Sequence, residues 1–252
     1  MSEPDVDYNP PLRETLPRLP QPYADKIFYY SQYDSLSRLS EGAAWSFIEV
    51  RPDVIVGYVP NDNAMDAARG VALYLSLWRQ VNGLGSEVPF PGTKKSWKAL
   101  HTDTNQDILA RFEIFASLKP ETCGKGEAYN IADASAPTTW ETKWPKLCEF
   151  FGLRGTGPED GGNEERVRKI QEFVQAHKSD WASIVKEKGL KINVMESYRW
   201  DFFEAILVGC DFNREYDLSK ARKVGFNEEI DTAKGYILAF GRLREAKIIP
   251  PA

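Results

Sequence analysis

The stretch from Trp45 to Val56 constrains the fold of this chain more than any other part of the sequence. It consists of two apolar runs, Trp45-Ser-Phe-Ile-Glu-Val50 and Val54-Ile-Val56, which are separated at Arg51-Pro52 and followed by Gly57. β-Branched and aromatic residues at this density suit a pleated strand that other parts of the chain cover. We therefore predict a buried strand over residues 45–56, interrupted at Arg51-Pro52.

Helical periodicity dominates the rest of the sequence. Apolar side chains recur at helical spacing between residues 63 and 82, which predicts a long central packing helix. A similar pattern over residues 24–39 ends near Gly42. Residues 1–22 contain six prolines and are expected to form an extended lead-in, because proline fixes φ and removes a backbone donor. We also expect helices at 103–117, 139–151, 163–176, 179–188 and 232–246, N-caps at Thr139 and Ser179, a strand at 128–131 and a low-complexity stretch over 152–162.

Composition and charge exclude several kinds of protein. Lys and Arg number 32 against 37 Asp and Glu, a net charge of −5, and the basic residues are scattered, so nucleic acid is not an expected partner. The sequence shows neither a secretory leader nor a membrane span. Three widely spaced cysteines and two histidines, His101 and His177, indicate no disulfide framework and no metal site. We therefore expect a cytoplasmic protein.

Short motifs that match one enzyme family occur in order along nearly the whole chain. They include Leu16-Pro17-Arg18, Phe28-Tyr29-Tyr30, Trp45-Ser46, Arg51-Pro52, Pro89-Phe90-Pro91-Gly92 with Trp97, Glu127-Ala128-Tyr129-Asn130, Thr139-Trp140 with Trp144, Trp181 with Ile184-Val185 and Gly189-Leu190, Gly225-Phe226, and Ala246 to Pro250. In order and spacing the sequence resembles the progesterone 5β-reductase/iridoid synthase-like (PRISE) branch of the extended short-chain dehydrogenase/reductases. Members of this branch reduce activated C=C bonds of enones or enals with NADPH.

The resemblance implies an α/β fold, namely the C-terminal part of an extended Rossmann fold. Residues 1–252 would form one incomplete domain: the lead-in over 1–22, the last sheet strands with the catalytic-tyrosine helix over 23–60, and a mostly helical substrate-binding lobe over 61–252. The family's nucleotide-binding half, with its Gly-rich turn and catalytic lysine, is expected to be missing from these residues. Loss of the neighbouring strands would leave an apolar sheet edge near residues 46–56, so we also expect self-association.

The resemblance also implies site residues. Tyr29 matches the catalytic tyrosine, whose phenol would stabilise the oxygen that gains charge during hydride transfer. Ile55 and the segment Asn63-Ala64-Met65 match positions that contact the nicotinamide of NADP(H), and Met65 also matches a substrate contact. Phe202 or Phe203 matches an aromatic wall of the substrate site. The alternative for Tyr29 and for both phenylalanines is ordinary packing between a helix and its neighbours.

Two motifs imitate parts of a dehydrogenase site. Tyr216-Asp-Leu-Ser-Lys220 has the YxxxK spacing of short-chain dehydrogenases, but we expect Asp217 or Ser219 to cap a helix there. Gly152-Leu-Arg-Gly155-Thr-Gly157 has the wrong spacing for a dinucleotide turn and precedes two acidic residues that would repel phosphate, so a loop is expected.

Two functions remain open at this point. The first is that of an NAD(P)H-dependent enone or enal reductase of specialised metabolism, acting on a small hydrophobic carbonyl substrate and poorly active when these residues are alone. The second is a non-enzymatic fragment that binds a hydrophobic small molecule or a partner chain.

Overall fold

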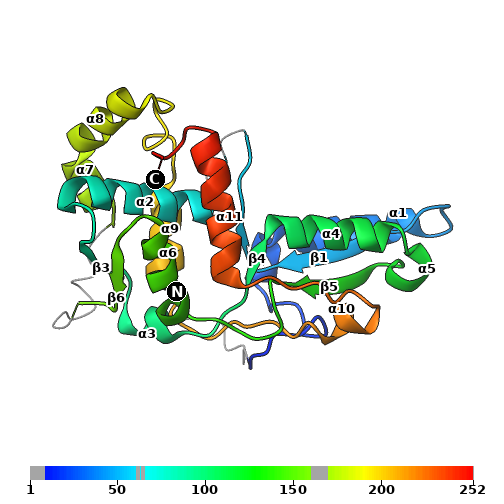
Figure 1. Cartoon of the computed structure of the whole chain (residues 1–252). Coiled ribbons are helices and arrows are strands. Elements are labelled where there is room, and N and C mark those ends of the chain that lie inside the picture. Colours follow the sequence, from blue (N-terminus) through cyan, green and yellow to red (C-terminus); the bar gives the residue numbers. More distant parts are fainter. Residues whose placement is uncertain (1–8, 61–62, 64–65, 160–169, 252) are drawn as a thin grey trace.

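The computed structural model describes residues 9–60, 63, 66–159 and 170–251. In this part of the chain, parallel strand pairs alternate with helices, as the α/β prediction requires (Figure 1). The strands are β1 (Ile48–Pro52), β2 (Val54–Val56), β3 (Glu87–Pro89), β4 (Asp103–Asn105), β5 (Glu127–Ile131) and β6 (Arg154–Thr156). The α-helices are α1 (Phe28–Ser40), α2 (Ala67–Asn82), α3 (Lys94–Lys98), α4 (Gln106–Ser117), α5 (Pro120–Cys123), α6 (Trp140–Phe150), α7 (Ile170–Ala176), α8 (Lys178–Lys188), α9 (Trp200–Glu204), α10 (Ser219–Lys223) and α11 (Thr232–Glu245).

The described strands form three separate parallel pairs. β1 pairs with β5, β2 with β4, and β3 with β6. The pairing begins at the first residue of β1, β2 and β3, which is Ile48, Val54 and Glu87 respectively. Every described strand therefore has one hydrogen-bonded neighbour among the described residues. Parallel strands are normally flanked and covered on both faces, so these pairs leave strand edges without a partner in the described part of the chain.

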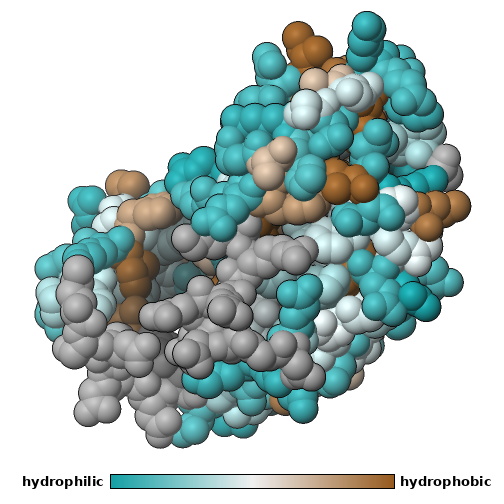
Figure 2. Space-filling model, turned by 90° about the vertical axis from the view of Figure 1, so that its left-hand side faces the viewer, coloured by the Kyte–Doolittle hydropathy of each residue, from teal (hydrophilic) through white to brown (hydrophobic). Residues whose placement is uncertain are grey.

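Two clusters of buried apolar side chains lie at opposite ends of the molecule. The larger surrounds α2 and includes residues from α6, α7, α8, α9 and α11. The smaller joins α4, β5 and α10, with Ile48 and Val50 of β1 packed against it. In Figure 1, α11 stands between the β1–β5 end and the helical end. Figure 2 shows that the exposed face of the helical end is mostly hydrophilic, with small separate apolar groups.

α2 forms where the apolar periodicity predicts the central helix. Its N-cap is Asp66, whose side chain accepts from the backbone N–H of Arg69, and the helix ends before Gly83 at a φ of 88°. The buried residues of α2 run without a break from Ala67 to Trp78. The predicted N-cap Thr139 is confirmed at α6, and the predicted strand at 128–131 is confirmed as β5.

Several predicted elements were wrong in detail. The strand over 45–56 begins at Ile48 and is interrupted at Asp53, not at Arg51-Pro52. Pro52 is tolerated inside β1 because β1 has a free edge among the described residues. Residues 103–105 form a strand and not a helix, because they pair with β2. The loop predicted over 152–157 contains β6, which pairs with β3.

The other differences concern helix ends. The predicted helix over 24–39 is divided into a 3₁₀ turn (Ala24–Lys26) and α1, with Ile27 in extended conformation between them. Ser179 is not an N-cap: α8 begins one residue earlier, and His177 occupies the cap position without a side-chain hydrogen bond. Residues 163–169 of another predicted helix lie outside the described part, and α7 accounts for its end.

Candidate active-site cavity

A cavity of about 930 Å³ lies where the lead-in, α1 and the ends of β1 and β2 meet. Its wall combines apolar and polar side chains from segments far apart in sequence, including Leu16, Tyr29, Ile55, Phe202 and Tyr216. This size is at the upper end of the range of pockets that enclose drug-sized ligands. The cavity thus brings together residues from the first part of the chain and from the predicted substrate-binding lobe.

Tyr29 and Tyr30 lie side by side at the start of α1 but have different surroundings. The Tyr30 hydroxyl accepts a hydrogen bond from the backbone N–H of Leu19 at 3.0 Å. The Arg18 guanidinium lies over the Tyr30 ring, 4.8 Å from its centroid, and also forms an ion pair with Asp34. Tyr29 is 61% exposed on the cavity, and among the described residues its hydroxyl has no hydrogen-bond partner. Tyr29 therefore has the phenol available to a ligand, whereas Tyr30 holds the lead-in.

The predicted cofactor-contacting residues lie on the same cavity where they are described. Ile55 lies on β2 and is 44% exposed, and Asn63 lies on the wall as well. Ala64 and Met65 lie outside the described residues, so the structure does not place them. Gly57, directly after β2, allows a close approach, since a Cβ there would lie 1.9 Å from Gln106 Oε1. That same oxygen accepts from the backbone N–H of Tyr58 at 2.6 Å.

The two candidate aromatic residues on α9 differ in position. Phe202 is half-buried and lines the cavity. Phe203 is fully buried and contacts the rings of Tyr74, Tyr198 and Trp200 in the larger core. Phe203 is therefore a core residue, and only Phe202 can contact a ligand in this cavity without a rearrangement of α9.

Sequence reasoning missed two carboxylates on the wall. Asp53 lies at the break between β1 and β2, and Arg214 Nε donates to its Oδ1 at 3.3 Å. Burial raises the pKa of Asp53 to about 6, although Arg214 opposes the shift. Burial likewise raises the pKa of Asp66 to about 6, with the backbone N–H of Arg69 opposing. The helix-cap position of Asp66 carried a recognisable signal, but no local pattern places Asp53 beside Arg214.

The side chains of the YxxxK-like motif, Tyr216 and Lys220, do not interact as the catalytic tyrosine and lysine of short-chain dehydrogenases do. The Tyr216 hydroxyl donates to the backbone oxygen of Pro52 at 3.3 Å, and burial raises its pKa. Lys220 pairs instead with Glu127 at 2.6 Å. Asp217 accepts from the backbone N–H of Ser219 at 2.8 Å, but the N-cap position of α10 belongs to Leu218, which makes no side-chain cap hydrogen bond. The predicted cap at Asp217 or Ser219 was therefore wrong, because α10 begins directly at Ser219. Tyr216 is nevertheless a wall residue of the cavity.

The arginines that line the described wall of the cavity are all engaged in ion pairs. Three arginines line it, and each is already paired: Arg13 with Asp217, Arg18 with Asp34, and Arg51 with Glu49. The described wall thus offers no unpaired arginine to a pyrophosphate. Within the described ranges, no cluster of His, Cys, Asp and Glu could hold a metal ion. None of the described helices is both long enough and apolar enough to cross a bilayer.

Comparison with known proteins gives a consistent result. The model of the PRISE-like Rossmann-fold domain family matches residues 2–250. The short chain dehydrogenase ausT of Aspergillus calidoustus is 37% identical over 241 residues, 96% of this chain and 58% of that protein. The short chain dehydrogenase sirS of Leptosphaeria maculans is 34% identical, over 95% of this chain and 60% of its own length. The 3-oxo-Delta(4,5)-steroid 5-beta-reductase of Arabidopsis thaliana is 28% identical, over 96% and 59%. The chain thus spans about three-fifths of the length of these relatives.

Proposed function

The chain belongs to the PRISE-like Rossmann-fold family, and from this premise we propose that it provides the substrate-binding part of an NAD(P)H-dependent oxidoreductase. The reaction proposed is reduction of a C=C bond conjugated to a carbonyl group, in a small hydrophobic substrate. The observation that carries the proposal is Tyr29, whose phenol has no hydrogen-bond partner among the described residues and lies on a large cavity that Phe202 also lines.

In this proposal Tyr29 acts on the carbonyl oxygen of the substrate. When bound, the nicotinamide cofactor would supply a hydride to the carbon β to the carbonyl group. Negative charge then develops on the carbonyl oxygen, and the Tyr29 hydroxyl stabilises it by donating a hydrogen bond. A proton taken up from solvent at the α-carbon completes the reduction. Phe202 contacts the apolar body of the substrate. Ile55 and Asn63, together with Ala64 and Met65 outside the described residues, are assigned to the nicotinamide side.

The residues described here supply the carbonyl-binding end of such a site. A polypeptide limited to these 252 residues is proposed to turn over substrate poorly or not at all, because hydride transfer requires the cofactor to be held against the substrate. Cys123, Cys148 and Cys210 are free thiols, which supports the proposal of a reducing, cytoplasmic setting. NADP(H) in place of NAD(H) is likewise a proposal.

A comparison of two tyrosine variants tests the function. We would join these residues to the part of the 37%-identical relative that the chain does not span, and measure reduction of conjugated enals and enones with NADPH and NADH. Tyr29→Phe removes a charge-stabilising donor and should lower kcat by roughly 10²- to 10³-fold. Tyr30→Phe loses only the hydrogen bond to Leu19 and should lower kcat less than about tenfold.

The unfused polypeptide, which should show no turnover, is the control. Equal losses from the two substitutions, or a larger loss from Tyr30→Phe, would mean that Tyr29 is not the catalytic phenol. A non-enzymatic role as a binding fragment is the second candidate, and it is favoured by the edge of β1 that has no strand partner in the described part of the chain. Absence of reduction by the fusion, together with saturable binding of an enone, would support that second role.

A further inference from the structure

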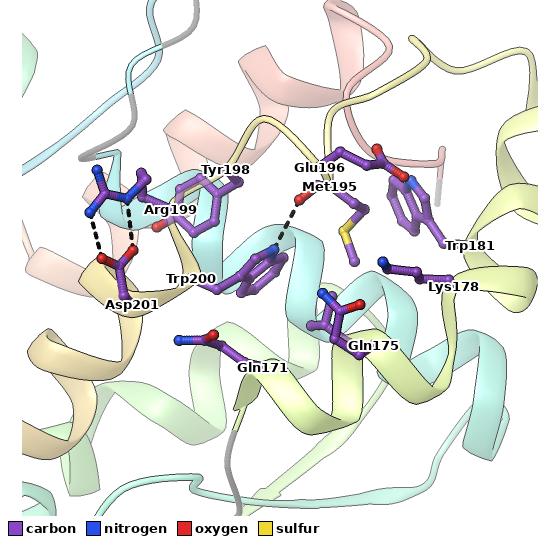
Figure 3. Close-up of a pocket in the computed structure, with 11 residues that line it drawn as sticks. Gln171, Gln175, Lys178, Trp181, Met195, Glu196, Tyr198, Arg199, Trp200 and Asp201 are labelled. Atoms are coloured by element: carbon purple, nitrogen blue, oxygen red, sulfur yellow. Dashed lines mark hydrogen bonds and ion pairs between the residues drawn. The ribbon is translucent and has the colours of Figure 1, made fainter.

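A second cavity of about 390 Å³ lies at the helical end, between α7, α8 and the segment 195–201 (Figure 3). None of its lining residues belongs to the wall of the first cavity. Its size is at the lower end of the range for ligand pockets, which suits a compact molecule of one or two fused rings. The proposed reaction makes no use of this cavity.

The floor of this cavity is apolar and fixed in place. Trp181, Met195 and Trp200 lie there, and all three are at least nine-tenths buried. The indole N–H of Trp200 donates to the backbone oxygen of Met195 at 2.9 Å, which holds that ring across the pocket. Aromatic rings beside a thioether form a surface on which a flat apolar group packs well.

Two residues that line the cavity carry hydrogen-bond donors for which the described part of the chain offers no acceptor. The indole nitrogen of Trp181 is buried and has no partner among the described residues, although buried indole N–H groups usually find one. Figure 3 shows the Lys178 side chain extending from α8 toward Met195 and Gln175. No ion pair of Lys178 occurs within the described residues. Both donors come from α8, whose first turn has no side-chain cap.

The other charged side chains near the cavity either form ion pairs with one another or would repel an anionic ligand. Arg199 and Asp201 form a two-bonded pair at 2.9 and 2.5 Å, so neither is available. Asp180, in the first turn of α8, is paired with His177 at 3.0 Å. Glu196 lines the cavity without a described partner, and its charge opposes an anionic ligand.

We propose that this second cavity binds a small organic acid with a flat apolar body. The carboxylate accepts hydrogen bonds from the Lys178 ammonium group and the Trp181 indole N–H. The ring system packs on Trp200 and Met195. Charge-assisted hydrogen bonds are stronger than neutral ones, so the acid binds more tightly than its neutral amide.

Calorimetric titration of the full 252-residue chain with 2-naphthoate at low salt tests this site. The expected result is saturable binding of one molecule with a sub-millimolar Kd. Lys178→Gln should weaken binding by about fivefold or more, and Trp181→Phe, which keeps a ring but removes the N–H, by about threefold or more. Glu196→Gln should tighten binding by about twofold, because it removes a repulsive charge. 2-Naphthamide should bind at least about fivefold more weakly than the acid.

Two controls make the result specific. Lys186→Gln removes a charge from the same helix without altering the cavity lining and should leave the Kd unchanged. Phe202→Ala alters the first cavity and should also have no effect. No saturable binding up to about 2 mM, an unchanged Kd in Lys178→Gln and Glu196→Gln, or loss of binding in Phe202→Ala would each overturn the proposal. Lys178 and Glu196 are exposed, so their variants decide the matter even if Trp181→Phe fails to fold.

Discussion

Lys143 on α6 and Asp103 on β4 form an ion pair in the interior, and neither lines a cavity described above. Their side chains are 1% and 2% exposed, and the Lys143 ammonium group lies 3.8 Å from the centroid of the Trp140 ring. Burial lowers the pKa of Lys143, and Asp103 opposes that shift. A buried charge without its partner is costly, so each residue depends on the other to remain ionised.

We predict that Lys143→Met will lower the free energy of unfolding by about 3–5 kcal/mol, because Asp103 is then left as a buried charge without its lysine. The double variant Lys143→Met, Asp103→Asn should recover much of the loss. Urea unfolding at pH 7 measures both. A double variant no more stable than Lys143→Met would contradict the coupling.

Asp133 is a second buried carboxylate, and it gives the protein a pH-dependent stability. One of its oxygens accepts from the backbone N–H of Asn105. Burial raises its pKa to about 7, with the hydrogen bond to Asn105 opposing. Between about pH 4 and pH 7 the native state therefore holds a proton that the unfolded chain has released. The free energy of unfolding falls across that window as pH rises.

The variant Asp133→Asn isolates this effect, because it keeps the oxygen acceptor and removes the ionisation. Relative to the wild type, the variant should become progressively more stable from pH 5 to pH 7, by at most about 1.4 kcal/mol per pH unit. The comparison cancels the opposite contribution of His101, whose pKa is lowered by burial to about 3. Thermal melts at closely spaced pH values provide the measurement. A stability difference that does not change with pH would show that Asp133 titrates normally.

At the scale of elements, α2 organises the larger core through close contacts on one face. A Cβ at Gly70 would lie 2.3 Å from the hydroxyl of Tyr198 and 2.8 Å from the ring of Phe203. The Tyr198 hydroxyl donates to the backbone oxygen of Asp66, the N-cap of the same helix. Gly70 thus lets the 198–203 segment approach the backbone of α2 and positions Phe202 beside the first cavity.

We predict that Gly70→Ala will destabilise the protein by about 1–3 kcal/mol, because overpacking at this contact exceeds the gain in helix propensity of up to about 1 kcal/mol. Gly241→Ala is the matched control. Gly241 lies within α11, and a Cβ there would meet nothing within 4 Å. Gly241→Ala should be neutral or stabilising by up to about 1 kcal/mol. Chemical unfolding of the two variants tests the contrast, and similar losses in both would argue against a specific contact at Gly70.

At the scale of the whole molecule, the end that carries β1 exposes apolar side chains. Phe28 and Leu39 on α1 are each 58% exposed. Trp45, which precedes β1, is 47% exposed, and Ile55 within β2 is 44% exposed. The neighbouring edge of β1 has no strand partner among the described residues. Exposed apolar patches beside open strand edges favour association between chains.

We predict that these 252 residues will self-associate with increasing concentration through this end of the molecule. The double variant Trp45→Lys, Ile55→Lys places charges beside the open edge and should shift the protein toward monomer. Ile192→Lys changes an equally apolar residue at the helical end, 74% exposed, and should not alter association. Sedimentation velocity over a hundredfold concentration range measures the effect. A wild-type protein that stays monomeric throughout would refute the prediction.

The sequence by itself determined the features that depend on neighbours three or four residues away. The apolar period of α2 and the Thr139 cap of α6 follow from local geometry, and each lies where it was predicted. The family assignment was also within reach, because the spacing of its motifs is a property of the sequence and the family model matches residues 2–250.

Only the tertiary structure decided features that depend on distant partners. β3 and β6 have three residues each and pair across more than sixty residues of chain, so neither has a local signal strong enough to predict it. Asp53 has a largely buried carboxylate, and its ion-pair partner Arg214 reaches it from a remote segment. Tyr29 and Tyr30 have the same side chain and differ only in what surrounds them. The spacing of apolar residues along the chain predicts a helix or a strand. The environment of a side chain, by contrast, is set by residues that contact it only after folding.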